Sequence, residues 1–396
     1  MNPDIAPTLN FLRERIRTAA VHRTPLRLRG GGSKDFYGQS LQGEVLDTTV
    51  LQGIVSYEPS ELVVTVRSGT PLAELEALLA ASGQYLPFEP PHYAWSQGHA
   101  TVGGMVASGL NGPARASAGS VRDHVLGVTL LNGRGELLRF GGEVIKNVAG
   151  YDVSRVMVGA MGTLGLLVDV SLKVLPLPPA EATLRFNMTQ AEALAQLHRW
   201  GGQPLPLNAS CWVNDAERHV HDDGRHDGQG TLFLRLRGAV AAVEAACRQL
   251  LSDALPIAQA MRLDNAQAAT DWRACRDHQR PFFTISPAPD MALWRLSVAQ
   301  TAPVLDVPWP QLVEWHGALR WLWAPLTAAS ALREAATTAR GHATVFVASQ
   351  ADTERTTGPF DVFTPLQTPL DRIHRQLKAE FDPAGVFNCG RLYSAF

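Results

Sequence analysis

Glycine is concentrated in three clusters in the first 165 residues, and these clusters constrain the possible fold more than any other feature of the sequence. They are Arg29–Lys34 (RGGGSK), Thr101–Gly104 (TVGG) and Gly159–Gly165 (GAMGTLG). Because glycine lacks a Cβ atom, the backbone of such loops can adopt left-handed angles, and successive amides can point at one anion. One such cluster is often a plain turn. Three clusters in one half of the chain favour a shared ligand.

The spacing of these glycines disfavours two familiar nucleotide-binding motifs. No G-x-x-x-x-G-K-[ST] sequence occurs, which argues against a P-loop, and no strand-linked G-x-G-x-x-G sequence supports a Rossmann site. Two of the loops could instead grip one pyrophosphate. The third runs into a predicted strand, 166–170, and could lie against a planar ring. The alternative is three tight turns in a glycine-rich fold.

The rest of the first half alternates helix and strand signals. The expected elements are a helix over 9–17 and strands over 26–29, 62–66, 125–131 and 137–140. We expect Thr70 to be the N-cap of a helix that begins at Pro71 and ends near Ala81. Asn132 and Gly133 accept positive φ angles, so they predict a type I′ turn between the last two strands.

The sequence Pro176–Pro179 (PLPP) interrupts this pattern and marks the best domain boundary. The segment after it has an α+β pattern with an antiparallel sheet. Its expected elements are strands over 182–187, 210–213, 231–236, 293–298, 318–323 and 344–348, and helices over 189–200, 239–251 and 327–339. A further helix is expected over 370–380. We therefore divide the chain into 1–180, 181–365 and a C-terminal tail, 366–396.

Composition narrows the range of partners. The 35 basic and 37 acidic residues leave a net charge of −2, so no large positive field attracts nucleic acid. Cys211, Cys247, Cys275 and Cys389 form no C-x-x-C motif, so an iron–sulfur cluster would have to belong to a partner. The first residues have no secretory pattern, and the longest apolar run, 156–168, is too short to span a bilayer. These features predict a cytoplasmic protein.

The three glycine clusters, taken in order, resemble those of a known family. Gly30–Ser33, the block from Thr101 to Gly127, and Gly162–Gly165 look like the corresponding segments of the FAD-linked oxidases typified by vanillyl-alcohol oxidase and p-cresol methylhydroxylase. The resemblance implies an α+β fold with an FAD-binding domain of the p-cresol methylhydroxylase type. That domain would consist of two α+β subdomains with FAD between them, built from roughly 1–180 together with the C-terminal tail. A separate α+β cap domain would contain an antiparallel sheet.

Other segments resemble more narrowly the FAD-binding E subunits of bacterial glycolate oxidases. They are Glu89–Tyr93 (EPPHY), Gly141–Asp152 (GGEVIKNVAGYD), Phe381–Asn388 (FDPAGVFN), 317–322 and 341–344. The similarity covers nearly the whole chain. It implies a subunit of a glycolate oxidase that oxidises a small 2-hydroxy acid to a 2-oxo acid, with a catalytic flavin subunit and an iron–sulfur subunit as partners. It leaves open a peripheral association with the inner face of the membrane through the complex.

The resemblance also implies which residues contact FAD. The amides of the first two loops would hold the pyrophosphate, the segment with Gly119 and Arg122 would line the isoalloxazine side, and 162–167 would lie near the adenosine end. The cofactor-binding candidates are Gly30, Gly31, Gly32, Ser33, Lys34, Pro90, Thr101, Val102, Gly103, Gly104, Ser108, Gly119, Arg122, Asp123, Gly162, Thr163, Gly165 and Leu166.

Two departures from the wider family concern the attachment of FAD. Members that bind FAD covalently carry a histidine in the first glycine loop, where this sequence has only Gly, Ser and Lys. Other members use a cysteine two residues before the second loop, and here that position is His99. We therefore expect non-covalent FAD.

Hydroxy-acid oxidation needs a base for the hydroxyl proton and a cation for the carboxylate. Related 2-hydroxy-acid dehydrogenases carry late histidine motifs for this purpose, and no H-x-G-x-G-N-x-H run occurs here. The remaining catalytic candidates are His342, His92 and Arg295. His316 is a further histidine that could act as a base, and Arg320 is a further arginine that could bind a carboxylate. A hydrogen-bonded structural histidine or an arginine in an ion pair is the alternative in each case.

One polar stretch contains His219, His221 and His226 among aspartates and could hold a divalent metal ion. Asp-Gly pairs punctuate it, so we interpret it as a solvated hairpin tip and predict no metal. Tryptophans gather between 294 and 323, where they form either the core of the cap or a partner-binding face.

Three functions fit these observations. The leading one is an FAD-binding subunit that helps to pass electrons from a catalytic flavin subunit toward an iron–sulfur subunit. The second is a self-sufficient FAD-dependent 2-hydroxy-acid dehydrogenase acting on glycolate or D-lactate. The third is a scaffold subunit without catalysis of its own. A nicotinamide-dependent reductase is a further alternative, because the glycine loops specify FAD and not its electron donor.

Overall fold

The computed structural model describes residues 5–39, 42–93, 98–143, 151–214, 229–349 and 360–394. The chain divides into two units, and each is described by itself. The first unit contains residues 1–111, 119–177 and 359–396, so the C-terminal tail belongs with the N-terminal half. The second contains residues 178–358 together with the short segment 112–118.

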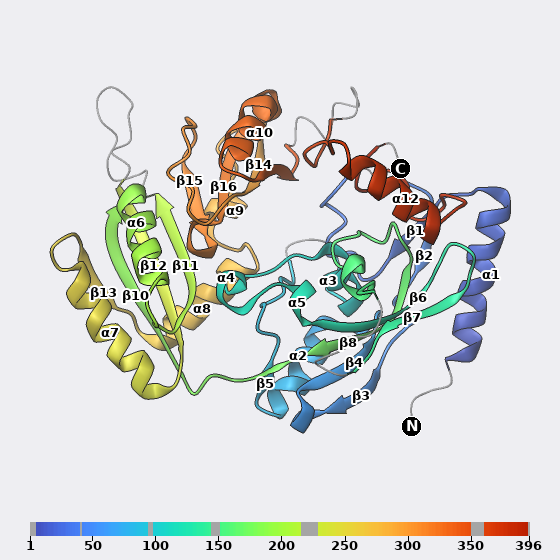
Figure 1. Cartoon of the computed structure of the whole chain (residues 1–396), viewed down its shortest axis with the longest axis horizontal. Helices are drawn as coiled ribbons and strands as arrows, with labels where there is room; N and C mark the ends of the chain where they lie inside the picture. Colours follow the sequence, from blue (N-terminus) through green and yellow to red (C-terminus); the bar gives the residue numbers. More distant parts are fainter. Residues whose placement is uncertain are drawn as a thin grey trace. The chain divides into compact units, whose positions relative to one another are not determined.

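The first unit is built on one five-stranded sheet and two two-stranded pairs (Figure 1). An antiparallel sheet contains, in this order, β3 (Ile54–Glu58), β4 (Val63–Arg67), β8 (Leu166–Lys173), β6 (Val125–Leu131) and β7 (Leu137–Gly141). Strands β1 (Leu26–Arg29) and β2 (Glu44–Asp47) form a parallel pair, and β5 (Gln84–Tyr85) pairs with β9 (Leu175–Pro176). The helices are α1 (Ala6–His22), α2 (Leu72–Ala81), α3 (Val102–Ser108), α5 (Val121–His124) and α12 (Leu370–Phe381).

The first unit has two hydrophobic cores. In one, α2 and α3 pack on the five-stranded sheet, and Leu75 of α2 lies in the same buried cluster as Val66 of β4. In the other, Leu12 and Ile16, one turn apart on α1, are buried with Phe387 of the C-terminal tail. Burial of each such side chain contributes about 1.5–3 kcal/mol. The tail is therefore part of the second core.

The second unit contains one antiparallel sheet of eight strands. Their order is β13 (Gln259–Arg262), β10 (Ala180–Thr189), β12 (Gln229–Gly238), β11 (Leu207–Asn214), β15 (Gln311–Glu314), β16 (Leu319–Pro325), β14 (Met291–Ser297) and β17 (His342–Val347). The helices are α4 (Arg115–Ala118), α6 (Gln190–Gly201), α7 (Val240–Ala254), α8 (Asn265–Arg276), α9 (Pro281–Thr284) and α10 (Ala329–Thr338). Helix α6 begins with a capping box, in which Thr189 and Glu192 satisfy each other's backbone amides. The α+β class and the antiparallel sheet agree with the sequence analysis.

The β6–β7 hairpin forms as expected, but the predicted type I′ turn is wrong. The connection is a longer loop, Asn132–Glu136, and its positive φ angle falls on Gly135 at 70°. Gly133 has a different role, because a Cβ atom there would lie 2.5 Å from Oδ1 of Asp382 in the tail. Its amide donates to Phe381 O at 2.8 Å. Gly133 therefore allows the tail to approach.

The predicted N-cap at Thr70 is also wrong. Helix α2 starts at Leu72 with Pro71 in the cap position and without a side-chain cap. The Thr70 hydroxyl instead bridges both backbone groups of Gly53, accepting from its N–H at 2.9 Å and donating to its carbonyl at 3.3 Å.

In the part of the chain that the structure describes, none of the helices has the length and apolar character needed to cross a membrane.

Candidate functional site

The first two glycine clusters lie in direct contact. The amide of His99 donates to Gly31 O at 3.0 Å, just before the second cluster begins. A Cβ atom on Gly31 would lie 2.1 Å from His99 O, and one on Gly30 would lie 2.5 Å from Thr101 Oγ1. No side chain fits at either distance. The approach of the two loops is therefore the reason why glycine stands at these two positions.

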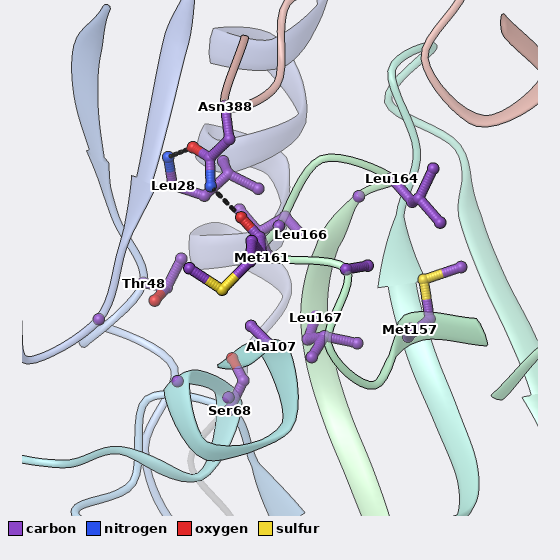
Figure 2. Close-up of a pocket in the computed structure, with 16 residues that line it drawn as sticks. Leu28, Thr48, Ser68, Ala107, Met157, Met161, Leu164, Leu166, Leu167 and Asn388 are labelled. Carbon is purple, nitrogen blue, oxygen red and sulfur yellow. Dashed lines mark hydrogen bonds between the residues drawn. The ribbon is translucent and has the colours of Figure 1, made fainter. Parts of the chain in front are cut away.

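A pocket of about 80 Å³ in the first unit brings all three clusters together (Figure 2). Six of the predicted cofactor-binding residues line it: Gly30, Gly103, Gly104, Gly162, Gly165 and Leu166. The rest of the wall is mainly apolar and includes Leu28, Met157, Met161, Leu164 and Leu167. An apolar surface beside exposed backbone amides can hold a flat heterocycle next to an anionic group.

The second cluster forms the start of helix α3. Thr101 is its N-cap, and the Thr101 hydroxyl accepts from Gly104 N at 3.2 Å. The preceding amide, Gly103 N, donates to Ser68 O at 2.6 Å. The Ser68 side chain lines the pocket, is 2% exposed, and its Oγ has no hydrogen-bond partner among the described residues. A buried hydroxyl in that state favours a polar ligand in the pocket.

The third cluster is held by Asn388 from the C-terminal tail. Asn388 Nδ2 donates to Met161 O at 2.6 Å, and its Oδ1 accepts from Leu28 N at 2.7 Å (Figure 2). The next residue, Gly162, has a φ of 74°, and a Cβ atom there would lie 2.6 Å from Asn388 Nδ2. Asn388 thus connects strand β1 with the third glycine loop.

Lys378 of α12 holds the same loop at a second point. Its buried ammonium donates to Thr163 O at 2.8 Å, to Phe387 O at 2.8 Å and to the Asp382 carboxylate at 2.7 Å. The Asp382 side chain is fully buried and also accepts from Phe387 N at 2.7 Å. A buried ion pair is favourable only when further hydrogen bonds satisfy its charges. Here the Lys378 ammonium has three acceptors and Asp382 Oδ2 has two donors, whereas Asp382 Oδ1 has no partner among the described residues.

Comparisons with known proteins identify the family. A family model described as an FAD binding domain matches residues 7–141. The glycolate oxidase subunit GlcE of Escherichia coli (strain K12) is 43% identical over 383 residues, which is 97% of either protein. This chain belongs to the GlcE family of FAD-linked oxidases. It is therefore an FAD-linked oxidoreductase, and FAD is its cofactor.

More distant relatives of this GlcE-family chain share its fold or part of its sequence. The glycolate oxidase subunit GlcD of Bacillus subtilis (strain 168) is 30% identical over 195 residues, which is 48% of this chain and 41% of GlcD. Among solved structures, 4-ethylphenol oxidase from Gulosibacter chungangensis has a TM-score of 0.67 at 13% identity and covers 97% of this chain and 87% of its own. An alkyldihydroxyacetonephosphate synthase has a TM-score of 0.64 at 14% identity, with 95% and 74% covered. These two similarities establish the fold alone.

The residues that line the pocket at the three glycine clusters fit a part of FAD. The glycines let the loops of the wall approach one another, since a Cβ atom on Gly30 or Gly162 would lie within 2.6 Å of a neighbouring side chain, and Ser68 Oγ offers an unused polar atom. A volume of about 80 Å³ is well below the roughly 300–1,000 Å³ of pockets that hold whole ligands of drug size. The pocket can therefore hold only one end of the cofactor.

The other cofactor-binding candidates do not line this pocket. Gly31, Gly32, Ser33, Lys34, Thr101, Val102, Ser108 and Thr163 lie in the chain near residues that do, and Pro90, Gly119, Arg122 and Asp123 lie elsewhere in the first unit. The Asp123 carboxylate accepts from Ser120 N and Oγ, both at 2.8 Å, which caps α5 and lowers the pKa of Asp123. Lys34 Nζ donates to Ser33 Oγ at 3.2 Å. Contact of these residues with FAD stays a prediction.

Two of the three catalytic candidates lie together in the second unit. Arg295 of β14 and His342 of β17 are on neighbouring antiparallel strands, since Ser297 pairs with His342 and Arg295 with Thr344. Loss of solvent around the ring and, second, the Arg295 charge lower the pKa of His342, although the residue as a whole is exposed. A lowered pKa favours the neutral imidazole, which is the form that can accept a proton.

The third catalytic candidate lies in the first unit, and the histidine stretch that could hold a metal ion lies outside the described residues. His92 lies in the first unit, where its Nε2 is 2.9 Å from Glu76 Oε2. His219, His221 and His226 fall outside the described residues. Within the described ranges, no group of three His, Cys, Asp or Glu side chains is arranged to hold a metal ion.

Sequence reasoning missed several residues of the pocket wall, among them Thr48, Ser68, Ala107, Ala160 and Asn388. Asn388 ends the FDPAGVFN segment that carried the resemblance, so its segment was found but not its contacts. Ser68 follows the predicted strand 62–66, and a serine after a strand is too common to mark a site. Ala107 lies in the 101–127 block and Ala160 in the third glycine cluster, so their segments were found but not their contacts with the pocket, and Thr48 carries no sequence signal.

Proposed function

We propose that this chain is the FAD-binding subunit of a multi-subunit glycolate oxidase that converts a small 2-hydroxy acid to the 2-oxo acid. A catalytic flavin subunit and an iron–sulfur subunit are its proposed partners, and electrons leave toward the second of these. The observation that carries the proposal is the 43% identity with GlcE along 97% of both chains. The sequence has no C-x-x-C motif of its own, which supports a separate iron–sulfur partner.

In this proposal the residues of the first unit bind and orient the cofactor. FAD, when bound, supplies a two-electron acceptor for the substrate or for a partner flavin. The amides of 30–34 donate to the pyrophosphate, and the Ser68 hydroxyl adds a hydrogen bond to the same part. The amides of 102–104 already donate to Thr70 O, Ser68 O and Thr101 Oγ1, so the second loop supports the first and does not itself supply these donors. Met161 and Leu164 exclude water from the adenosine end, and the segment of Gly119 and Arg122 lines the ring side. Binding is non-covalent, because the first loop offers only Gly, Ser and Lys.

The test compares the purified chain with the reconstituted complex. The isolated chain should be yellow and should release its flavin on denaturation. Anaerobic glycolate should bleach the flavin of this chain in the presence of the catalytic flavin subunit, and much more slowly without it. Full-rate glycolate oxidation by a complex that lacks this chain would overturn the proposal, and a colourless chain that takes up no added FAD would favour a scaffold role.

A self-sufficient 2-hydroxy-acid dehydrogenase is the second candidate, and one observation favours it. Arg295 and His342 lie on neighbouring strands and could supply a cation for the carboxylate and a base for the hydroxyl proton. In that case glycolate or D-lactate should bleach the flavin of the isolated chain at full rate, and Arg295→Gln should raise KM while His342→Gln lowers kcat.

A cytoplasmic location, with the complex at the inner face of the membrane, is part of the leading proposal and is checked by cell fractionation.

A further inference from the structure

A second and larger cavity lies within the second unit, between the sheet and helices α8 and α9. Its volume is about 260 Å³, compared with about 80 Å³ for the pocket at the glycine clusters. Cys211, Phe233 and Leu312 line it from strands β11, β12 and β15. Trp272, Cys275 and Phe282 line it from the helices. None of the functions considered above uses this cavity.

The polar side chains of the wall have partners of their own. Trp272 Nε1 donates to Thr183 Oγ1 at 3.0 Å, and Cys275 Sγ donates to Glu314 Oε1 at 3.3 Å. A hydrogen bond with Cys211 and, second, burial raise the pKa of Cys275 well above its usual range, so the thiol stays neutral. The cavity therefore presents mainly aromatic, aliphatic and sulfur surface.

The aromatic wall is held in a fixed orientation from behind. The guanidinium carbon of Arg235 lies 4.8 Å from the centre of a Trp272 ring, and Arg235 Nε donates to Asn208 Oδ1 at 2.7 Å. Arg235 is 2% exposed, so neither contact is weakened by solvent. The Trp272 ring is thus fixed by a hydrogen bond at its nitrogen and by a cation at its face.

The charged groups in the wall neutralise each other. Arg280 Nη1 and Asp271 Oδ1 are 2.7 Å apart, and the two side chains are 44% and 37% exposed. They mark the side of the cavity that is open to solvent. Because their charges cancel, they give a bound ligand no net charge to pair with.

We propose that this cavity is a binding site for a small uncharged molecule with one aromatic ring or two fused rings. An ordered water needs two to four polar partners. Trp272 Nε1 and Cys275 Sγ already donate within the protein, and the Arg280–Asp271 pair lies at the open side, so the deep part of the wall is a poor site for water. An engineered apolar cavity of about 150 Å³ is known to stay dry and to bind benzene. A volume of about 260 Å³ leaves room for a second ring. The site goes beyond the proposed FAD chemistry and does not depend on it.

The test is a titration of the FAD-loaded protein with 2-naphthol, an uncharged two-ring probe, and with 2-naphthoate, its anionic counterpart. We expect saturable binding of 2-naphthol with a Kd below about 1 mM and at least tenfold weaker binding of 2-naphthoate. Ala268 of α8 is buried and lines the cavity, so Ala268→Leu should weaken 2-naphthol binding at least tenfold. Ala266 is exposed on the same helix, and Ala266→Leu is the matched control.

A second measurement uses the wild-type protein and does not depend on the folding of a variant. The rate of alkylation by N-ethylmaleimide is followed at each cysteine by peptide mass spectrometry. Bound 2-naphthol should slow modification of Cys211 several-fold and leave Cys247, which lies in the α7 core, unchanged. Absence of saturable binding, equal binding of 2-naphthoate, or binding without protection of Cys211 would overturn the proposal. The flavin spectrum reports separately on the first unit.

Discussion

Replacement of Asn388 by aspartate should weaken FAD binding although it hardly changes the shape of the side chain. Asn388 is 9% exposed, donates to Met161 O at 2.6 Å and accepts from Leu28 N at 2.7 Å. Aspartate keeps the acceptor for Leu28 N but loses the donor, and it places a carboxylate oxygen against the Met161 carbonyl. Met161 and Gly162 line the pocket, so the loop must move where FAD is expected to bind.

The size of the effect follows from the lost hydrogen bond. A buried acceptor left without a partner costs about 1–3 kcal/mol, and about 1.4 kcal/mol corresponds to a factor of ten in affinity. We therefore expect the Kd for FAD to rise about 10- to 100-fold, measured by titrating the flavin-free protein with FAD at pH 7.5. Asn10→Asp, the same change on the exposed face of α1, is the control. A folded Asn388→Asp protein with a Kd within twofold of wild type would refute the role of the tail in positioning this loop.

Three further changes test other parts of the structure. Gly31→Ala should give no FAD-loaded protein, because its Cβ would lie 2.1 Å from a backbone oxygen, whereas Gly142→Ala meets nothing within 4 Å and should keep its flavin absorbance. Lys378→Met should lower the free energy of unfolding in urea by about 3–5 kcal/mol, because it leaves the Asp382 carboxylate buried and unpaired, and adding Asp382→Asn should restore part of the loss. Burial lowers the pKa of His316 from 6.5 to about 4. Between these values the unfolded chain binds a proton that the native protein does not, so stability should fall by about 3 kcal/mol as the pH drops from 6.5 to 4, and His316→Gln should flatten that slope.

The glycine clusters could be predicted from the sequence because the constraint that selects glycine is local. Gly162 needs a positive φ angle, and Gly31 needs an absent side chain, and both requirements leave a visible mark in the sequence. That the three clusters share one pocket came from the order of the motifs and the family they resemble. Ser68 and Asn388 could not be assigned in this way, because their roles depend on contacts with residues far away in the chain.

Local rules failed where a tertiary contact replaced the local one. An Asn-Gly pair ordinarily selects a two-residue turn, but Gly133 is used to admit Asp382, and the positive φ angle moves to Gly135. Thr70 has the sequence context of an N-cap, yet its hydroxyl satisfies the backbone of Gly53 instead. In both cases a contact with a residue outside the local segment, Asp382 or Gly53, formed in place of the local turn or cap.

The C-terminal tail contacts the glycine clusters for a physical reason that these clusters themselves create. Glycine loses more conformational entropy on folding than any other residue, and it has no side chain through which a loop could be anchored. Such loops can be held only through their backbone, and the tail supplies the donors: Asn388 to Met161 O, Lys378 to Thr163 O, and Arg391 to a carbonyl of the first cluster. Two of these donors are cations, whose hydrogen bonds to carbonyl oxygens are stronger than those of neutral groups. The glycine backbone that lines the pocket and the tail donors that hold it are therefore parts of one arrangement, although 215 to 357 residues of sequence separate the bonded pairs.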